Sequence, residues 1–224
     1  KIFHGIESPH QMTSIQCGEV EAVHKVTTEN VYAQQLVEVE GQTDILTMGI
    51  PYICPYNVHS IMNPILVMCT GLGYFFNLYR GKPLVREGGV VILTHPTTNE
   101  FHPVHHPSYI DFFEEVLADT RDPHVMSQKW EQQYAEDDWY RHLYRTTNAY
   151  HGVHPFYMWY WGSHGMKHVG KVIIVGGDAP TVRKLGFTPA STMNDALEIA
   201  SDTVGRSPTI THIKTPPLMI ADVK

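Results

Sequence analysis

The feature that most constrains this chain is a pair of apolar segments joined by a long connection. Residues 44–50 (DILTMGI) and 88–93 (GGVVIL) both read as buried strands. The connection is long enough for a right-handed helical crossover, which would make the two strands parallel. Residues 171–175 (KVIIV) form the clearest strand candidate of the chain. Strand and helix signals alternate along the sequence, which predicts a three-layer α/β fold with a mainly parallel sheet and helices on both faces.

Shorter signals fill in the expected order of elements. Strands are expected at residues 2–6, 36–39 and 209–213, and helices are expected from Gly18 and at 193–204, the latter ending at Gly205. A helix between Tyr56 and Tyr79 should be interrupted by Pro64, Gly71 and Gly73. Ser108 and Asp178 are expected to cap two further helices.

Residues 122–161 have a different texture, because aromatic side chains alternate with charged ones. This pattern predicts an aromatic-rich helical insertion between strands. The length of 224 residues fits one α/β domain, residues 1–224, that carries this insertion. The start at Lys1, without Met, fits a piece of a longer protein.

The charge and the cysteines narrow the classes of function. Lys and Arg number 16 against 23 Asp and Glu, a formal net charge of −7, which disfavours broad binding to nucleic acid or to anionic membranes. No apolar run reaches the length of a membrane span. Three widely spaced cysteines give no disulfide framework and no zinc motif, which favours a reducing cytoplasm.

Polar residues follow both central strand candidates, at the ends where α/β sheets bind ligands. The first exit runs through residues 51–59 and the second through residues 95–106. We therefore expect the functional site at this edge of the sheet.

The second exit contains His102, His105 and His106, and imidazole clusters bind transition metals. These three histidines are candidate metal ligands, although their spacing matches no zinc signature. The alternative is a proline-stiffened surface loop in which the rings bond to backbone carbonyls. A second group, His164 and Lys167, precedes the strand at residues 171–175 and is a candidate ligand contact. Its alternative is an aromatic cover over the edge of the sheet.

The order of several segments resembles the C-terminal half of the nickel-dependent lactate racemase family. The resemblance rests on GEVEAVH at residues 18–24, on the Asp-led strand from residue 44 and on GGVVIL at residues 88–93. It continues with KVIIV at residues 171–175, RKLGFT at 183–188 and NDAL at 194–197. It covers most of the chain in order, with residues 122–161 as an expansion.

The resemblance implies a two-domain enzyme that racemises or epimerises a 2-hydroxy acid by hydride transfer to a nickel-pincer nucleotide. It implies that the missing N-terminal half binds most of that cofactor and that this half, inactive by itself, contacts the substrate in the cleft. The family's Gln and Lys pair has no counterpart between residues 57 and 80. The candidate substrate contacts here are Asn57, His59, Asn63, Asn77, Arg80 and His95.

Two other functions stay open from the sequence. One is a stand-alone, His-rich module that binds a metal ion or a small anion without catalysis. The other is a structural half that dimerises through its aromatic segment, so a homo-oligomer is also an open option.

Overall fold

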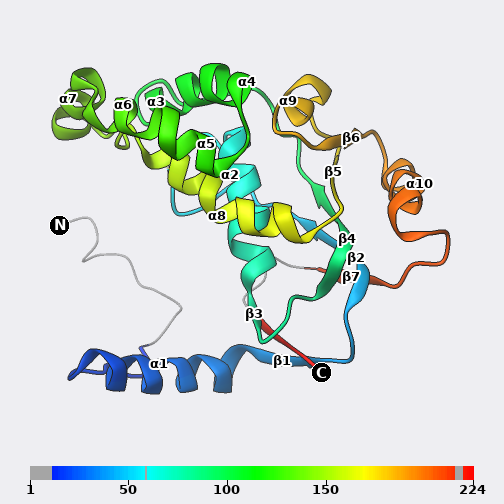
Figure 1. The fold of residues 1–224 in the computed structure, drawn as a ribbon. Helices are drawn as coiled ribbons and strands as arrows, with labels where there is room; N and C mark the ends of the chain where they lie inside the picture. Colours follow the sequence, from blue (N-terminus) through cyan, green and yellow to red (C-terminus); the bar gives the residue numbers. More distant parts are fainter. Residues whose placement is uncertain (1–11, 59, 215–218) are drawn as a thin grey trace. The chain divides into compact units, whose positions relative to one another are not determined.

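The two apolar segments form neighbouring parallel strands at the centre of a five-stranded sheet (Figure 1), in a computed structural model that describes residues 12–58, 60–214 and 219–224. The strand order is β6-β5-β4-β2-β7, and every pair is parallel. The strands are β2 (Thr43–Gly49), β4 (Val85–Thr94), β5 (Lys171–Val175), β6 (Thr188–Ala190) and β7 (Ile210–Ile213). The expected strand at residues 2–6 lies outside the described residues.

The sheet is buried on both faces because successive side chains of each strand point to opposite sides. Leu46, Met48, Val91 and Leu93 belong to the larger hydrophobic core, whereas Ile45 and Val90 belong to a smaller one. Two apolar faces need two layers of helices, and the structure has them. The three-layer α/β fold predicted from the sequence is confirmed.

The smaller core lies under α10 (Met193–Val204), and α9 (Ala179–Lys184) follows β5. Asp178 caps α9, and Thr192 with Asp195 forms a capping box for α10, which ends at Gly205 as predicted. The larger core is covered by the remaining helical segments (Figure 1). They are α2 (Pro64–Met68), the π-helix η2 (Cys69–Tyr74), the 3-10 helix η3 (Phe75–Asn77), α3 (Pro107–Asp111), the π-helix η4 (Phe112–Val116), α4 (Leu117–Asp119), α5 (Pro123–Met126), the π-helix η5 (Ser127–Glu131), α6 (Gln132–Glu136), α7 (Asp138–Thr146) and α8 (His154–His168).

The predicted interruption between Tyr56 and Tyr79 has a packing reason. The helix starts at Pro64, continues as a π-helix from Cys69 and ends at Asn77. A Cβ atom on Gly71 would lie 2.8 Å from a methyl group of Leu93, and one on Gly73 would lie 3.1 Å from the Cβ of Trp161. The two glycines therefore allow this segment to lie directly against the sheet and against α8.

A second, three-stranded sheet corrects the sequence interpretation. Tyr79 and Arg80, expected at the end of a helix, form β3, which pairs with β8 (Ile220–Val223) in the order β1-β8-β3. The strand β1 (Leu36–Val39) was predicted from its alternating side chains. Very short strands such as β3 and β8 depend on partners far away in the chain, so local patterns do not reveal them.

The chain divides into two compact units, Lys1–Leu36 and Val37–Lys224. In the first unit, α1 (Val20–Gln35) begins at Glu19, whose carboxylate accepts a hydrogen bond from the backbone N–H of Ala22, and it buries none of its side chains. In the second unit, α5 to α7 and the first half of α8 lie within residues 122–161; that this segment is an insertion stays a prediction. The assignment of residues 1–224 to one domain of a two-domain protein stays a prediction.

None of the helices in the described ranges combines the length and the apolar character that a bilayer crossing requires.

Asp44 ties three strands together at the amino edge of the sheet. Its carboxylate accepts hydrogen bonds from the backbone N–H and the hydroxyl of Thr209, both at 2.8 Å. It also forms an ion pair with Arg86 at 2.7 Å. The bonds from Thr209, followed by the one from Arg86, lower the pKa of Asp44 from 3.8 to about 2.

We expect Asp44→Asn to lower the free energy of unfolding at pH 7 by about 1 kcal/mol, allowing for solvent screening. The folded-state pKa is depressed, so this contribution is present above pH 4 and is lost as the pH falls towards 2. Urea unfolding at both pH values checks this. The control is Asp138→Asn, because the Asp138 side chain is fully exposed. Equal stability of the two variants at pH 7 would contradict the prediction.

Candidate functional site

The segments that follow β2 and β4 lie at the same edge of the sheet. Gly49 pairs with Thr94, so the two strands end at the same level. Residues 51–58 and 95–106 therefore leave the sheet side by side, as the sequence predicted. His59, the residue that follows the first of these segments in the sequence, lies outside the described residues.

His95 is the first residue after β4, and its side chain is 6% exposed. Its Nδ1 atom accepts a hydrogen bond from the backbone N–H of Thr97 at 2.9 Å. A neutral imidazole that accepts at Nδ1 carries its proton on Nε2. That Nε2 is buried without a partner, and the exposed ring of Tyr52 lies 5.2 Å from the imidazole, centroid to centroid.

The neighbouring Thr97 is a local sign of strain. Its φ angle of 45° is the only positive one among the described residues other than glycine, and its side chain is fully buried. Such a backbone conformation has a cost of order 1 kcal/mol and is common at functional sites. It turns the chain so that the Thr97 N–H can reach the imidazole of His95.

Asn63 supplies a second buried donor at this edge. Its Oδ1 caps α2 by accepting from the backbone N–H groups of Ile65 and Leu66, at 3.1 and 3.0 Å. Its Nδ2 is fully buried without a partner. Asn57, in contrast, is satisfied at both ends, because Oδ1 accepts from the N–H of Cys54 and Nδ2 donates to the carbonyl of Tyr52. Asn57 therefore shapes the loop that covers His95.

Two histidines and four tyrosines form a connected group nearby, which we term the edge cluster. Its members are Tyr56, Tyr74, His106, Tyr109, Tyr150 and His154. His106 Nε2 donates to the carbonyl oxygen of Tyr56 at 2.9 Å, and its ring stacks on Tyr150.

Hydroxyl groups complete the edge cluster. The Tyr109 hydroxyl and His154 Nδ1 share a hydrogen bond of 2.5 Å, as do the hydroxyls of Tyr56 and Tyr74. The ring of Tyr150 also stacks on His154, with the centroids 4.3 Å apart. These contacts join the loop after β2, the loop after β4 and the start of α8.

Burial keeps the histidines of this edge neutral. Desolvation lowers the pKa of His95, His106 and His154 from 6.5 to about 4. For His106 the nearby His105 and His102 add to this effect, and for His154 His106 and His151 do so. Burial also raises the pKa of Tyr109 well above 10. These three buried rings are therefore uncharged hydrogen-bonding groups at pH 7.

An apolar pocket of about 250 Å³ lies beside the edge cluster and shares Tyr74 with it. It is lined by Pro51, Ile53, Cys54, Pro55, Thr70, Tyr74, Phe75 and Leu78. The pocket accommodates a small apolar group next to the tyrosine hydroxyls.

The candidate metal ligands lie together, and His102 Nδ1 and His106 Nε2 already take part in hydrogen bonds. The rings of His102 and His105 are 4.2 Å apart, and Nδ1 of His102 accepts from the backbone N–H of His105 at 3.1 Å. His106 bonds the carbonyl of Tyr56. No three His, Cys, Asp or Glu side chains in the described ranges are arranged to hold a metal ion. Metal binding by these histidines stays a prediction.

The other predicted residues lie away from this edge. Arg80 pairs with Asp222 across β3 and β8, where it holds the small sheet together. Asn77 donates to the carbonyls of Leu72 and Gly73 at the end of the π-helix. It also lines a hollow that contains His164, and Lys167 lines the adjoining hollow.

The four tyrosines of the edge cluster were not among the site residues selected from the sequence. Tyr56, Tyr109 and Tyr150 meet only through tertiary contacts, and no local spacing relates them. The one available signal was the run from Tyr150 to His154 ahead of Pro155, which places a histidine at the start of a helix.

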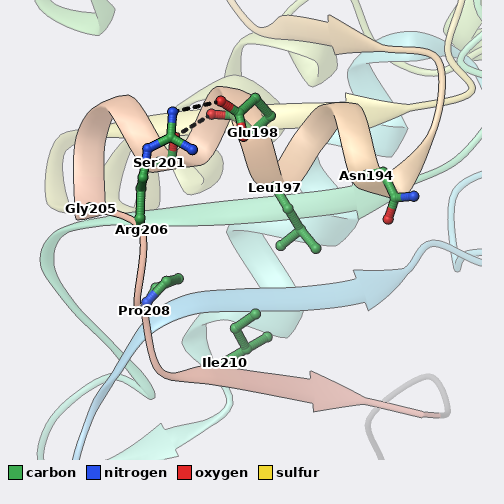
Figure 2. A pocket seen from close by; sticks show the side chains of 8 residues that line it. All are labelled: Asn194, Leu197, Glu198, Ser201, Gly205, Arg206, Pro208 and Ile210. Atoms are coloured by element: carbon green, nitrogen blue, oxygen red, sulfur yellow. Dashed lines mark hydrogen bonds and ion pairs between the residues drawn. The ribbon is translucent and has the colours of Figure 1, made fainter.

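A further pocket, on the opposite face of the sheet between α10 and β7, is less suited to chemistry (Figure 2). It has a volume of about 310 Å³, and Leu197 points into it, towards Ile210. Its cation, Arg206, is paired with Glu198 at 3.0 Å. The two charges neutralise each other at an exposed position, so this pocket offers no free charge.

Comparisons with known proteins give a likeness in structure and none in sequence. No family model matches the chain, and no curated protein does. The fold is similar to the lactate racemase apoprotein from Thermoanaerobacterium thermosaccharolyticum, with 18% sequence identity and a TM-score of 0.49. The similarity covers 91% of this chain and 41% of that one, so the chain spans less than half the length of that racemase.

Proposed function

We propose that this chain is the substrate-contacting half of a racemase or epimerase that acts on a 2-hydroxy acid, with the carboxyl edge of its sheet facing the other half. The proposal is supported chiefly by the two buried donors without partners, His95 Nε2 and Asn63 Nδ2. A buried N–H group without an acceptor costs about 1–3 kcal/mol, and a bound acceptor would remove that cost.

A 2-hydroxy acid has the complementary chemistry. Its carboxylate and hydroxyl oxygens all accept hydrogen bonds, and the edge offers neutral N–H and O–H donors. His95 Nε2 and Asn63 Nδ2 would hold the carboxylate. The tyrosine hydroxyls of the edge cluster, which are both donors and acceptors, would orient the substrate hydroxyl and keep water away from the reacting carbon.

The covering residue is Tyr52, which is 72% exposed although its ring contacts His95. In this structure the donors are closed off from solvent, so binding requires residues 51–58 to move. Tyr52 itself can move with little loss of packing because its side chain is mostly exposed, whereas Cys54 and Asn57 in the same loop are buried.

The nickel-pincer nucleotide implied by the family resemblance has no ligand set among the described residues. In the proposed enzyme the other half holds that cofactor, which would accept and return the hydride. The role of this chain is limited to binding and orienting the acid.

The test uses the complete protein, with both halves and loaded cofactor. Proton–deuterium exchange at the carbinol carbon is followed across a panel of 2-hydroxy acids. We expect exchange with at least one acid and no exchange with the present chain alone. Absence of exchange across the panel would overturn the proposed reaction.

His95→Asn probes the binding role in the same assay. The Asn Oδ1 can replace Nδ1 as acceptor for the Thr97 N–H, but the donor at the Nε2 position is removed. We expect kcat/KM to fall by roughly 10²-fold, the value of a lost hydrogen bond to a charged group, while thermal stability stays within about 1 kcal/mol. Lys82→Ala provides the comparison, since Lys82 is exposed in the turn before β4, and its kcat/KM should stay unchanged. Unchanged kcat/KM in His95→Asn would exclude the assigned contact.

A further inference from the structure

The exposed stripe of α8 forms the floor of two adjoining hollows. One, of about 440 Å³, is lined by Pro123, His124, Ser127, Tyr160, Ser163, His164 and Lys167. The other, of about 380 Å³, is lined by Gly73, Tyr74, Asn77, Tyr160, Trp161 and His164. They share Tyr160 and His164, so together they form one continuous surface, which we term the α8 groove. This size is sufficient for a small organic ligand.

One end of the α8 groove is suited to an anion. Lys167 contributes an ammonium group, and His124 and His164 contribute ring nitrogens. The described lining residues of both hollows include no Asp or Glu, although the chain carries a formal charge of −7. This end is therefore a local exception in an acidic protein.

Two carboxylates beside this end of the groove make their own hydrogen bonds. Asp122 caps α5 by accepting from the N–H groups of His124 and Val125, and its negative charge also interacts with His124 and Lys167. Glu131 accepts a hydrogen bond from the Tyr160 hydroxyl at 2.8 Å. Ser163 donates to the carbonyl of Trp159 and so offers only an acceptor. The donors that remain for a ligand come from Lys167 and the two histidines, with His164 Nε2 in a 3.5 Å contact to Tyr79.

The other end of the α8 groove is suited to a flat ring. Trp161 is 47% exposed, and the ring of Tyr74 meets it edge-on at 5.3 Å with an interplanar angle of 89°. This edge contact holds the indole in place and leaves the remainder of its surface to stack on another ring. Asn77 lies at the same end; its Nδ2 donates to backbone carbonyls, so only its Oδ1 is left to accept a hydrogen bond from a polar ring edge.

We propose that the α8 groove binds a phosphate monoester that carries a flat ring, such as a nucleoside monophosphate. Lys167, His124 and His164 hold the phosphate, and Trp161 stacks on the ring. Both anchor side chains, Trp161 and Lys167, stand on the same helix, so the distance between the two subsites is fixed. The α8 groove shares Tyr74 with the edge cluster, but the two anchors, Trp161 and Lys167, lie outside that cluster, so this binding does not depend on the proposed racemase function.

The experiment is calorimetry of the full chain with adenosine monophosphate, with inorganic phosphate and with adenosine. We expect one molecule of adenosine monophosphate to bind with a Kd of about 1 mM or lower, and each partial ligand to bind at least about tenfold more weakly. Lys167→Ala and Trp161→Ala should each weaken adenosine monophosphate by about tenfold.

The matched control is Lys82→Ala, an exposed lysine in the turn between β3 and β4, which should leave binding unchanged. Thermal unfolding shows that each variant is folded. The proposal is overturned by an absence of binding at millimolar ligand. It is also overturned if inorganic phosphate or adenosine binds as tightly as the nucleotide, or if both groove variants bind like the parent chain.

Discussion

A Gly152→Ala variant is expected to lose at least about 3 kcal/mol of its free energy of unfolding, because the added methyl group has no space. A Cβ atom on Gly152 would overlap the backbone carbonyl of Tyr134 and would lie 3.0 Å from the ring of Tyr140. A backbone carbonyl cannot turn aside as a side chain can. Either the segment before α8 or helix α6 must shift.

The shift would also be visible in the edge cluster. Gly152 lies between Tyr150 and His154 in the sequence, and the rings of these two residues stack on each other. The ring of His154 also contacts the rings of Tyr56 and Tyr109. Urea unfolding measures the loss of stability, and near-ultraviolet circular dichroism measures the loss of tyrosine packing.

Gly49→Ala is the control for this variant. Gly49 has an ordinary φ angle, and its added Cβ would meet only the Thr94 hydroxyl, at 3.9 Å. Its stability should stay within about 0.5 kcal/mol of the parent. A Gly152→Ala protein as stable as Gly49→Ala would show that the loop before α8 is not packed as described.

The second large effect is expected with acid. His95, His106 and His154 have pKa values of about 4 in the folded chain, below the ordinary 6.5. Between pH 6.5 and 4 the unfolded chain takes up protons that the folded chain does not. Stability is therefore full above pH 6.5 and is lost as the pH falls to 4, by up to about 3 kcal/mol for each histidine.

Two variants separate these histidines from the carboxylates, which titrate at lower pH. His106→Gln and His154→Gln each remove one of the groups, so each should flatten the decrease in stability between pH 6.5 and 4.5. In His106→Gln the new amide can still donate to the Tyr56 carbonyl, which preserves the fold at pH 7. Urea unfolding across this range gives the slopes. If both variants keep the slope of the parent chain, the histidines are not the cause.

The central sheet could be predicted because its strands are buried on both faces. Such strands appear as short continuous apolar runs, and β2, β4 and β5 all have this character. The start of β4 was missed, since the strand begins at Val85 and its register against β2 shifts between Val85 and Val90, a stretch that includes Gly88 with a φ of +72°. The charged residues Arg86 and Glu87 hide this first part of the strand from any count of apolar residues.

Some helix starts were predicted correctly from their capping residues, and one was not. Thr192 and Asp178 cap their helices as expected, because each side chain reaches a free backbone N–H of the first turn. Ser108 does not cap one: the helix begins one residue earlier, at Pro107, with His106 at the cap position. Proline is favoured in the first turn because it lacks an N–H that would otherwise be unpaired. Pro107 therefore starts the helix, and Ser108 lies inside its first turn.

The edge at which we expect the site follows from the ends of the strands, whereas its candidate members were chosen by residue type. Asn57 and Asn77 were selected as polar groups able to meet a substrate, and both bind backbone carbonyls. Arg80 was selected as a replacement cation, and it serves an ion pair between strands. Whether an amide is free for a ligand depends on the local path of the backbone, which no single residue reveals. The two donors left unpaired, on His95 and Asn63, became apparent only with the structure.

The strand that pairs with β2 on the side opposite β4 is β7, and its late position in the sequence affects how the chain folds during synthesis. Ile45 pairs with Ile210, so the strand that completes this side of the sheet is synthesised after β2, β4, β5 and β6. Until then β2 presents an unpaired edge next to the apolar strand β4, a surface on which nascent chains aggregate. The sheet should therefore be completed only once β7 has left the ribosome, and a growing chain that stalls before β7 should require a chaperone.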